Sequence, residues 1–420
     1  MASPAPSCTV PRNRSPLLRR ARDGFAALFP LDPGLTSGPL AARAPWLLWL
    51  LVAFSVTWQF RGAHAGQLLG LDAQSLWLAA EAAVRGESPF STSFPFVYLP
   101  SSALLAWPFG LGSNDVLKGV FLLLTGVGIP LAAALSVRLV GMSARSWLAA
   151  LLALATTLTL PGQYAYSLLN FMIVALVMLP FVLAQMRAVQ WTSCGVLVGV
   201  SIAVKPMLVP LGWFALIDRR WRALAVMAGI PLVLSLLALA LLPEPDRFFT
   251  EVLPWLLQGE DETLWPYLSA LLPVGLVQGW PLAVVNAVRL GVAALGLVLA
   301  TLLWRRTADQ TLRVVESTGL LLAASFLAFS AATPTYLLLL LPLLASSVRA
   351  GAIAANPVAW VGVLVAAAPG FPGDDWGTAG ISRRVAVGLL VAFLAWSWSA
   401  MTRLRAAGDT HAKEAVAPAS

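Results

Sequence analysis

Charged residues are scarce in this sequence, and so are cysteine and histidine. Only 11% of the 420 residues are charged, 59% are hydrophobic, and the mean hydropathy is +0.81. A soluble domain usually carries about 25% charged residues, so this composition excludes one. The two cysteines, Cys8 in the N-terminal segment and Cys194 within an apolar run, are poorly placed to pair, which excludes a disulfide framework. With His64 and His411 as the only histidines, a His/Cys metal centre is excluded as well.

The chain has instead a succession of apolar runs from Trp46 nearly to Met401. A helix that rises about 1.5 Å per residue needs about 20 such residues to cross a hydrocarbon core of roughly 30 Å. The net charge of +8 comes largely from arginines at the ends of these runs, where basic residues set membrane topology, so no nucleic-acid partner is implied. The sequence predicts an all-α polytopic integral membrane protein with about twelve transmembrane helices.

The basic residues also predict the orientation. Residues 1–44, rich in proline, serine and arginine, are expected to form a basic, disordered cytoplasmic tail. Residues 45–402 form the membrane domain, and residues 403–420 a second cytoplasmic tail. The stretch 99–112 is apolar but short and broken by Pro100 and Pro108, so we expect an interfacial helix in the first outer loop. This choice keeps Arg138 and Arg145 inside, in a multi-pass protein of the cell (plasma) membrane.

Lys205 and Pro206 interrupt the apolar segment Thr192–Ile217. Proline breaks the helical ladder, so we expect a hairpin of two short helices with Lys205 at its outer tip. An ammonium group in this position has two interpretations. It snorkels to the interface, or it binds the phosphate of a lipid-linked substrate at the outer leaflet.

Asp72 is a carboxylate just beyond the first apolar run. One interpretation is that it caps the helix that begins near Ala73, because aspartate is a preferred capping residue. The other is that it acts as a general base, since a hydroxyl nucleophile at neutral pH needs a positioned acceptor for its proton. The sequence leaves both open.

Other polar and aromatic positions carry weaker signals. Asn170 either bridges helices or hydrogen-bonds a sugar or phosphate. The run Glu260-Asp261-Glu262 is either a solvated acidic face or a divalent-cation site. Gly195 and Gly199 indicate close helix packing rather than phosphate binding, and Trp77 offers an aromatic face to a sugar.

Together these features resemble glycosyltransferase family 87, a group of GT-C-type enzymes that use polyprenyl-phosphate sugars. The resemblance is carried by Asp72 followed by Trp77, by Phe96-Val97-Tyr98-Leu99-Pro100, by Gln163 to Asn170, by Lys205-Pro206, and by Arg219-Arg220-Trp221-Arg222. Within the family, the stretch Val204–Leu257 is similar to the actinobacterial arabinofuranosyltransferases that introduce α-(1→3) branches into arabinogalactan. The resemblance implies a GT-C bundle with interfacial helices in the first outer loop.

The resemblance also implies an activity and a set of site residues. It implies an inverting transfer of a sugar, arabinofuranose first and mannose second, from a polyprenyl-phosphate donor to a cell-envelope glycan or glycolipid on the outer face. The implied roles are general base for Asp72, donor-phosphate binding for Lys205 and Arg247, and substrate contact for Trp77, Tyr98, Asn170 and Tyr336. No cofactor is required, although a divalent cation is left open. The alternatives are a transporter or flippase for a lipid-linked sugar, or a non-catalytic membrane scaffold.

Overall fold

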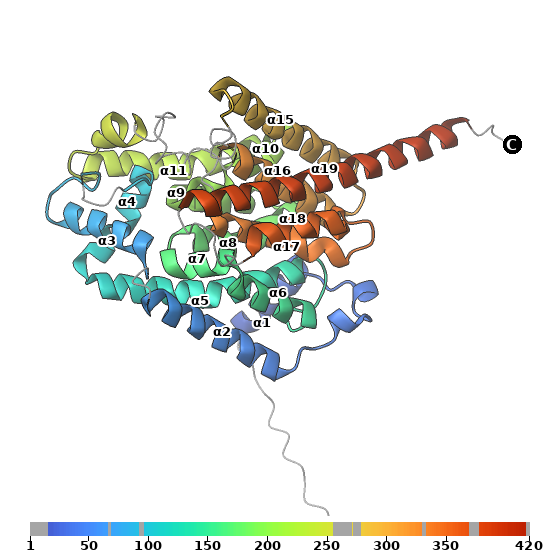
Figure 1. Cartoon of the computed structure of the whole chain (residues 1–420), viewed down its shortest axis with the longest axis horizontal. Coiled ribbons are helices and arrows are strands. Elements are labelled where there is room, and N and C mark those ends of the chain that lie inside the picture. The colour runs from blue at the N-terminus through green and yellow to red at the C-terminus, as the bar shows by residue number, and fades with distance from the viewer. Residues whose placement is uncertain are drawn as a thin grey trace, which may run out of the picture.

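The computed structural model describes residues 16–65, 69–91, 96–254, 271, 279–329, 333–368 and 378–416. In these ranges the regular structure is helical (Figure 1), apart from one isolated bridge between Arg43 and Ser146. The α-helices are α1 (Pro16–Leu28), α2 (Trp46–Ala65), α3 (Leu71–Val84), α4 (Pro100–Ala106), α5 (Asn114–Leu139), α6 (Trp147–Leu158), α7 (Leu160–Leu168), α8 (Met172–Arg187), α9 (Trp191–Val204), α10 (Gly212–Ile217), α11 (Trp221–Leu241), α15 (Leu282–Arg306), α16 (Gln310–Phe329), α17 (Leu341–Ala345), α18 (Pro357–Ala367) and α19 (Thr378–Val416). The shorter turns are η1 (Pro33–Leu35), η2 (Pro39–Ala41), η3 (Trp107–Leu111), η4 (Pro206–Leu211), η5 (Phe248–Val252), η6 (Pro334–Leu340), η7 (Ser346–Val348) and η8 (Ile353–Ala355).

The architecture is that of a polytopic membrane protein, as the composition predicts. Five described helices are long and apolar enough to cross a membrane, namely α5, α11, α15, α16 and residues 383–406 of α19. The pair α6 and α7, bent by 64° at its junction, makes a sixth if it counts as one span. We expected about twelve crossings, but the described part of the chain has fewer helices long enough to span. Much of its remaining apolar sequence folds into helices of 10–17 residues.

Proline positions explain two of these short elements, and both were predicted. The stretch 99–112 folds as α4 followed by η3 and does not form a span. The segment around Lys205 breaks as expected, since α9 ends at Val204 and η4 begins at Pro206. A proline at the first helical position lacks only an N–H that would have no intrahelical partner, so Pro100 and Pro206 can each start a new helix. Pro206 also helps to end α9, because proline cannot continue the hydrogen-bond ladder of that helix.

Close helix pairs build the core, and α9 against α11 is one of the most extensive. A Cβ atom on Gly195 would lie 2.8 Å from the carbonyl oxygen of Ala223, and one on Gly199 would lie 3.0 Å from that of Val226. The two glycines therefore let the helix backbones approach. The prediction that Gly195 and Gly199 serve helix packing is confirmed.

The two terminal segments contain more helix than the sequence suggested. Residues 1–44 were expected to be a disordered tail, yet α1, η1 and η2 lie within them. Phe29, directly after α1, is fully buried and packs edge-on against Phe181 of α8 at 5.5 Å between ring centroids. At the other end α19 continues past position 402, where the sequence placed a boundary, to Val416. The contact between Phe29 and Phe181 holds the end of α1 against α8, which composition alone does not reveal.

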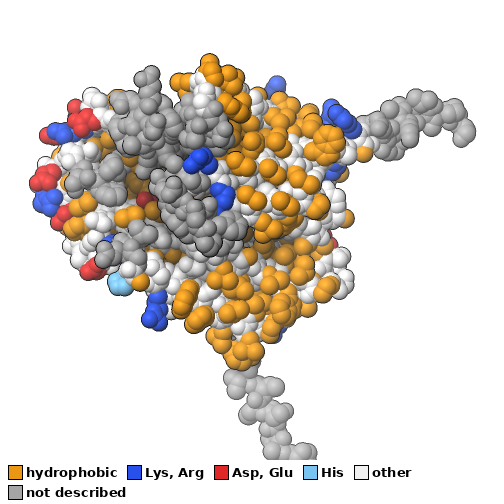
Figure 2. Space-filling model, viewed as in Figure 1, with side chains coloured by type: hydrophobic (Ala, Val, Ile, Leu, Met, Phe, Trp, Pro, Cys, Tyr) orange, Lys and Arg blue, Asp and Glu red, His pale blue; other side chains and the backbone are white. Residues whose placement is uncertain are grey.

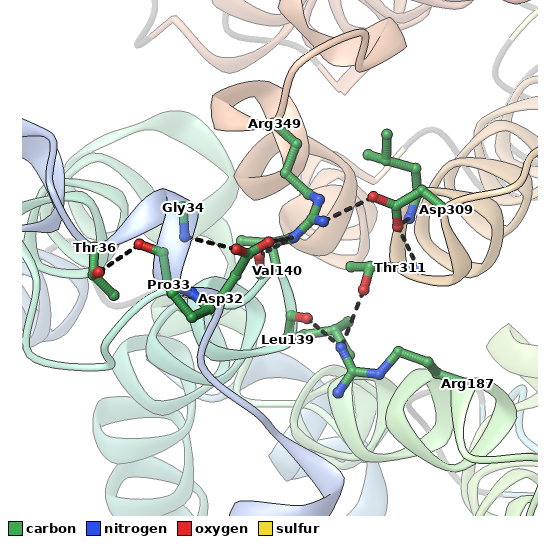
Figure 3. Close-up of polar contacts among 11 residues, drawn as sticks. Asp32, Pro33, Gly34, Thr36, Leu139, Val140, Arg187, Asp309, Thr311 and Arg349 are labelled. Carbon is green, nitrogen blue, oxygen red and sulfur yellow. Dashed lines mark hydrogen bonds and ion pairs between the residues drawn. The ribbon is translucent and has the colours of Figure 1, made fainter.

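A cluster of ion pairs joins several segments just beyond the C-terminal end of α5 (Figure 3). The Arg349 guanidinium lies 3.2 Å from the carboxylate of Asp32 and 2.7 Å from that of Asp309, and it also donates to the Val140 carbonyl at 2.8 Å. Arg187 donates to the Leu139 carbonyl at 2.7 Å. Arg349 is 15% exposed and its two carboxylate partners are each 35% exposed, so the cluster is partly shielded from water.

Asp309 titrates abnormally in this cluster. Burial alone would raise its pKa, but hydrogen bonds from the Leu312 amide, the Arg349 guanidinium and the Thr311 amide outweigh burial and hold the pKa of Asp309 below its usual range. Because the folded protein keeps Asp309 ionised at lower pH than the unfolded chain does, the pair stabilises the fold fully above about pH 4. The stabilisation is lost as the pH falls through the folded pKa.

We therefore expect Arg349→Met to lower the free energy of unfolding by about 1–2 kcal/mol at neutral pH. Thermal unfolding of the detergent-solubilised protein between pH 7 and pH 3 measures the difference from the wild type. The difference should shrink as the pH falls below about 4 and through the folded pKa of Asp309, because the ion pair is lost once Asp309 of the folded wild type takes up a proton. A difference that stays constant with pH would contradict this account of the ion pair.

Candidate functional site

Asp72 lies in the first turn of α3 but does not cap the helix. The residue at the N-cap position is Gly70, with φ of +79°, and no side chain caps this end. The helix-cap interpretation of Asp72 is therefore wrong. The structure instead directs the carboxylate toward residues of two other segments.

One oxygen of the Asp72 carboxylate is fixed by two hydrogen bonds. Oδ2 accepts from the Tyr98 hydroxyl at 3.2 Å and from Nδ2 of Asn170 at 2.9 Å. Asn170 is itself held in place, since its Oδ1 accepts from the Met172 amide at 2.8 Å and its side chain is buried. Among the described residues none donates to Oδ1 of Asp72. The carboxylate is thus oriented through one oxygen and available through the other.

Lys205 lies at the break between α9 and η4, with its ammonium over two tyrosine rings. Nζ is 5.2 Å from the ring centroid of Tyr98 and 5.6 Å from that of Tyr336. The side chain is half-buried, and in the described part of the chain no carboxylate lies within ion-pair distance of it. Such cation–π contacts stabilise a cation that is partly removed from water without neutralising it.

Tyr98 joins these two groups. Its hydroxyl donates to Asp72, and its ring lies under the ammonium of Lys205. Neighbouring rings hold Tyr98 in turn: Phe96 lies 5.3 Å and Phe171 6.1 Å from it between centroids. The structure therefore brings Asp72, Tyr98, Asn170, Lys205 and Tyr336 together, from five separate segments of the chain.

Two serines, Ser101 and Ser102, hold the backbone next to Lys205, and no sequence pattern indicated this role. The Ser101 and Ser102 hydroxyls donate to the Ala203 carbonyl at 2.7 Å and 3.1 Å, and Ser102 also donates to the Val204 carbonyl at 2.7 Å. These carbonyls belong to the last turn of α9, which has no intrahelical donors for them. Both serines are fully buried. Only the contact between α4 and α9, about 100 residues apart in sequence, shows their role.

We expect Ser102→Ala to weaken the fold by about 1–2 kcal/mol, because it leaves a buried carbonyl without a donor. The released end of α9 should also displace Lys205. Any activity that depends on its ammonium group should therefore decrease along with the stability of the fold. Thermal unfolding and an activity assay on one preparation measure the two effects. The exposed Ser91, which donates to the Ser88 carbonyl at 3.1 Å, supplies the matched control Ser91→Ala, for which both should be unchanged.

Two predicted site residues are not brought to this cluster. The indole N–H of Trp77 donates to the Gly112 carbonyl at 3.0 Å, which fixes α3 to the end of η3. Arg247 lies 2.7 Å from the carboxylate of Glu244 and 3.7 Å from that of Glu251, so two neighbouring glutamates already balance its charge. Their contact with a substrate remains a prediction.

A metal site finds no support in the described residues. No group of three or more His, Cys, Asp or Glu residues able to hold a metal ion occurs among them. The run Glu260-Asp261-Glu262, named as a candidate cation site, lies outside the described residues.

A comparison with known families decides the family of this chain. Residues 96–330, more than half of the chain, match the model of glycosyltransferase family 87. The chain belongs to this family. The family 87 match includes Tyr98, Asn170 and Lys205, whereas Asp72 and Tyr336 lie outside it.

Two proteins similar to this chain share a name. An α-(1→3)-arabinofuranosyltransferase of Mycobacterium tuberculosis is 30% identical over 274 residues, which are 64% of this chain and 62% of that protein. Its counterpart from Corynebacterium glutamicum is 24% identical over 349 residues, 79% of this chain and 81% of that protein. The chain thus spans less than two thirds of the M. tuberculosis relative that it matches. No solved structure matches the chain.

Proposed function

We propose that this protein is an inverting membrane glycosyltransferase that moves a sugar from a polyprenyl-phosphate donor to a cell-envelope glycan or glycolipid. One observation carries the proposal: a single tyrosine, Tyr98, joins an oriented carboxylate to an ammonium that has no carboxylate partner in the described structure. A base and a cation in one cluster suit a reaction that releases a proton at one point and an anion at another. The family match supports the same class of reaction.

The proposed reaction is a single displacement. An acceptor hydroxyl oxygen attacks the anomeric carbon of the donor sugar while the bond from that carbon to the phosphate oxygen breaks, so the configuration inverts. Oδ1 of Asp72 takes the hydroxyl proton, and the bonding electron pair leaves with the polyprenyl phosphate. Lys205 stabilises the departing phosphate, which needs no protonation. The transition state resembles an oxocarbenium ion, so alignment of the two substrates in a partly dehydrated site supplies much of the acceleration.

The printed names of the relatives support arabinofuranose as the donor sugar. Mannose is the second candidate. The polyprenyl phosphate is a lipid, which agrees with a site at the end of a membrane bundle rather than in a soluble domain.

Arginine placement supports an outward-facing site in the plasma membrane. Arg138, Arg187 and Arg349 lie at the C-terminal end of α5, whereas Asp72 lies near its N-terminal end, where α3 packs on α5. Basic residues are retained on the cytoplasmic side. The arginine end then faces the cytoplasm, as do both termini, and Asp72 faces outward.

The test is transfer of labelled sugar by the purified protein in lipid nanodiscs. Polyprenyl-phosphate arabinofuranose and polyprenyl-phosphate mannose are each supplied with a short arabinan acceptor, and products are resolved by mass. A new glycosidic bond from the arabinose donor supports the proposal, and one from mannose alone replaces the sugar. If neither forms a product while proteoliposomes move the labelled lipid between leaflets, the protein is a transporter and the proposal is overturned.

A further inference from the structure

A groove between α2 and α5 lies on the hydrophobic surface and takes no part in the mechanism above. Its volume is about 470 Å³, and every residue that lines it is hydrophobic or glycine. It extends along α5 from Gly119 to Pro130, about 16 Å at about 1.5 Å per residue, and along α2 between Trp49 and Phe60. Its length and volume suit one extended hydrocarbon chain.

The groove opens toward lipid. Phe54 and Trp58 of α2 and Leu123 and Val127 of α5 are exposed hydrophobic side chains on its flanks or its lining. Hydrophobic side chains cover the lower part of Figure 2, where α2 lies in Figure 1. Because α5 starts near Asp72, the groove occupies the part of the bundle nearer the candidate site.

A lysine lies between this groove and the candidate site. Lys118 directly precedes Gly119, the groove residue nearest the start of α5, and its side chain is half-buried. Its stem lies flat on Gly70, because a Cβ there would be 3.0 Å from Cγ and 3.1 Å from Cε of the lysine. Gly70 is two residues before Asp72. In the described part of the chain nothing pairs with the Lys118 ammonium.

We propose that the α2–α5 groove binds the hydrocarbon chain of a lipid-linked acceptor, and that Lys118 binds the phosphate of that lipid. The inference rests on the proposed function, in which Lys205 already meets the donor phosphate. A transferase must bring two substrates to one site. Lys118 of α5 supplies a second cation next to the start of α3, on a different helix from the end of α9 that carries Lys205. An anionic lipid matches both the charge of Lys118 and the apolar groove that continues from it.

Filling the groove tests the inference. A Cβ on Gly119 meets no atom within 4 Å, so the Gly119→Leu protein should fold normally. Its leucine side chain should then occupy the part of the groove that would hold the hydrocarbon chain of the lipid. We expect the KM for an acceptor sugar carrying an alkyl-phosphate anchor to rise about tenfold, while the KM for the same sugar without an anchor stays unchanged. Gly229→Leu on α11 is the matched control, since a Cβ on Gly229 also meets nothing within 4 Å.

Removing the charge tests the phosphate. Lys118→Gln should raise the KM for the alkyl-phosphate acceptor about tenfold and leave an acceptor with an uncharged alkyl anchor unaffected. A rise in the donor KM instead would assign the groove to the donor chain and overturn the inference. Unchanged KM values together with a loss of co-purified phospholipid would assign it to a bilayer lipid, which also overturns it.

A binding measurement separates this inference from the proposed function. Native mass spectrometry of the protein with the alkyl-phosphate acceptor, without any donor, counts bound acceptor lipid in the wild type and in Gly119→Leu. Lower occupancy in the variant with no transfer by either protein would sink the proposed function and leave the lipid site standing. Equal occupancy with normal transfer would sink the lipid site alone.

Discussion

Asp72→Asn is expected to lower the rate of glycosyl transfer about 10³-fold, within the range of 10²–10⁴ typical of a lost general base. The amide oxygen of asparagine can occupy the place of Oδ2 and accept from Tyr98 and Asn170 as the carboxylate does. The fold and the orientation of the side chain should therefore survive. What is lost is the basic oxygen that takes the acceptor proton.

The measurement is the initial rate of sugar transfer at saturating donor, with thermal unfolding as the check on folding. Glu81→Gln on the same helix is the matched control, because Glu81 forms a partly exposed pair with Arg85 at 3.0 Å and lies outside the cluster. Its rate should stay within about twofold of the wild type, since such pairs contribute little. A folded Asp72→Asn protein with the wild-type rate would show that the carboxylate only holds Tyr98 and Asn170.

Lys205→Met should lower kcat about 10²-fold, comparable to removing one group that stabilises developing negative charge. Methionine keeps an unbranched stem of similar length between Tyr98 and Tyr336, so packing should be retained while the charge is lost. The loss should fall on kcat, because the phosphate carries most of its charge only as the glycosidic bond breaks.

Lys205→Arg separates charge from shape. Arginine retains the charge but spreads it over a planar group, so we expect an intermediate rate. The control for loss of a surface cation is Arg85→Met, which removes a side chain that is half exposed and paired with two glutamates. If Lys205→Met keeps the wild-type kcat and only the donor KM rises, the lysine binds the ground state alone and its proposed role in the transition state is wrong.

The sequence alone allows the cap interpretation of Asp72, and the cluster shows why it is wrong. Aspartate near the start of a helix is a common cap, and Asp72 does lie in the first turn of α3. Whether its carboxylate turns back to the helix or away from it depends on donors elsewhere. Tyr98 is 26 residues away and Asn170 is 98 residues away, so no local pattern reports them.

The order of residue types was enough to predict the membrane class, the short helix after residue 99, the break at Lys205-Pro206 and the packing role of Gly195 and Gly199. These follow from hydropathy, from the missing N–H of proline and from the missing side chain of glycine, all of which act within a few residues. It also named Asp72, Tyr98, Asn170, Lys205 and Tyr336 individually.

How these residues meet became visible only once the helices were packed together. The tertiary structure joined Asp72 and Lys205 through Tyr98, assigned Asn170 to the carboxylate, and placed Trp77 and Arg247 in contacts of their own. It also revealed Ser101 and Ser102 behind Lys205. Hydrogen bonds and cation–π contacts between distant segments form only when helix packing brings the segments together. The residues near each position in the sequence therefore do not indicate these contacts.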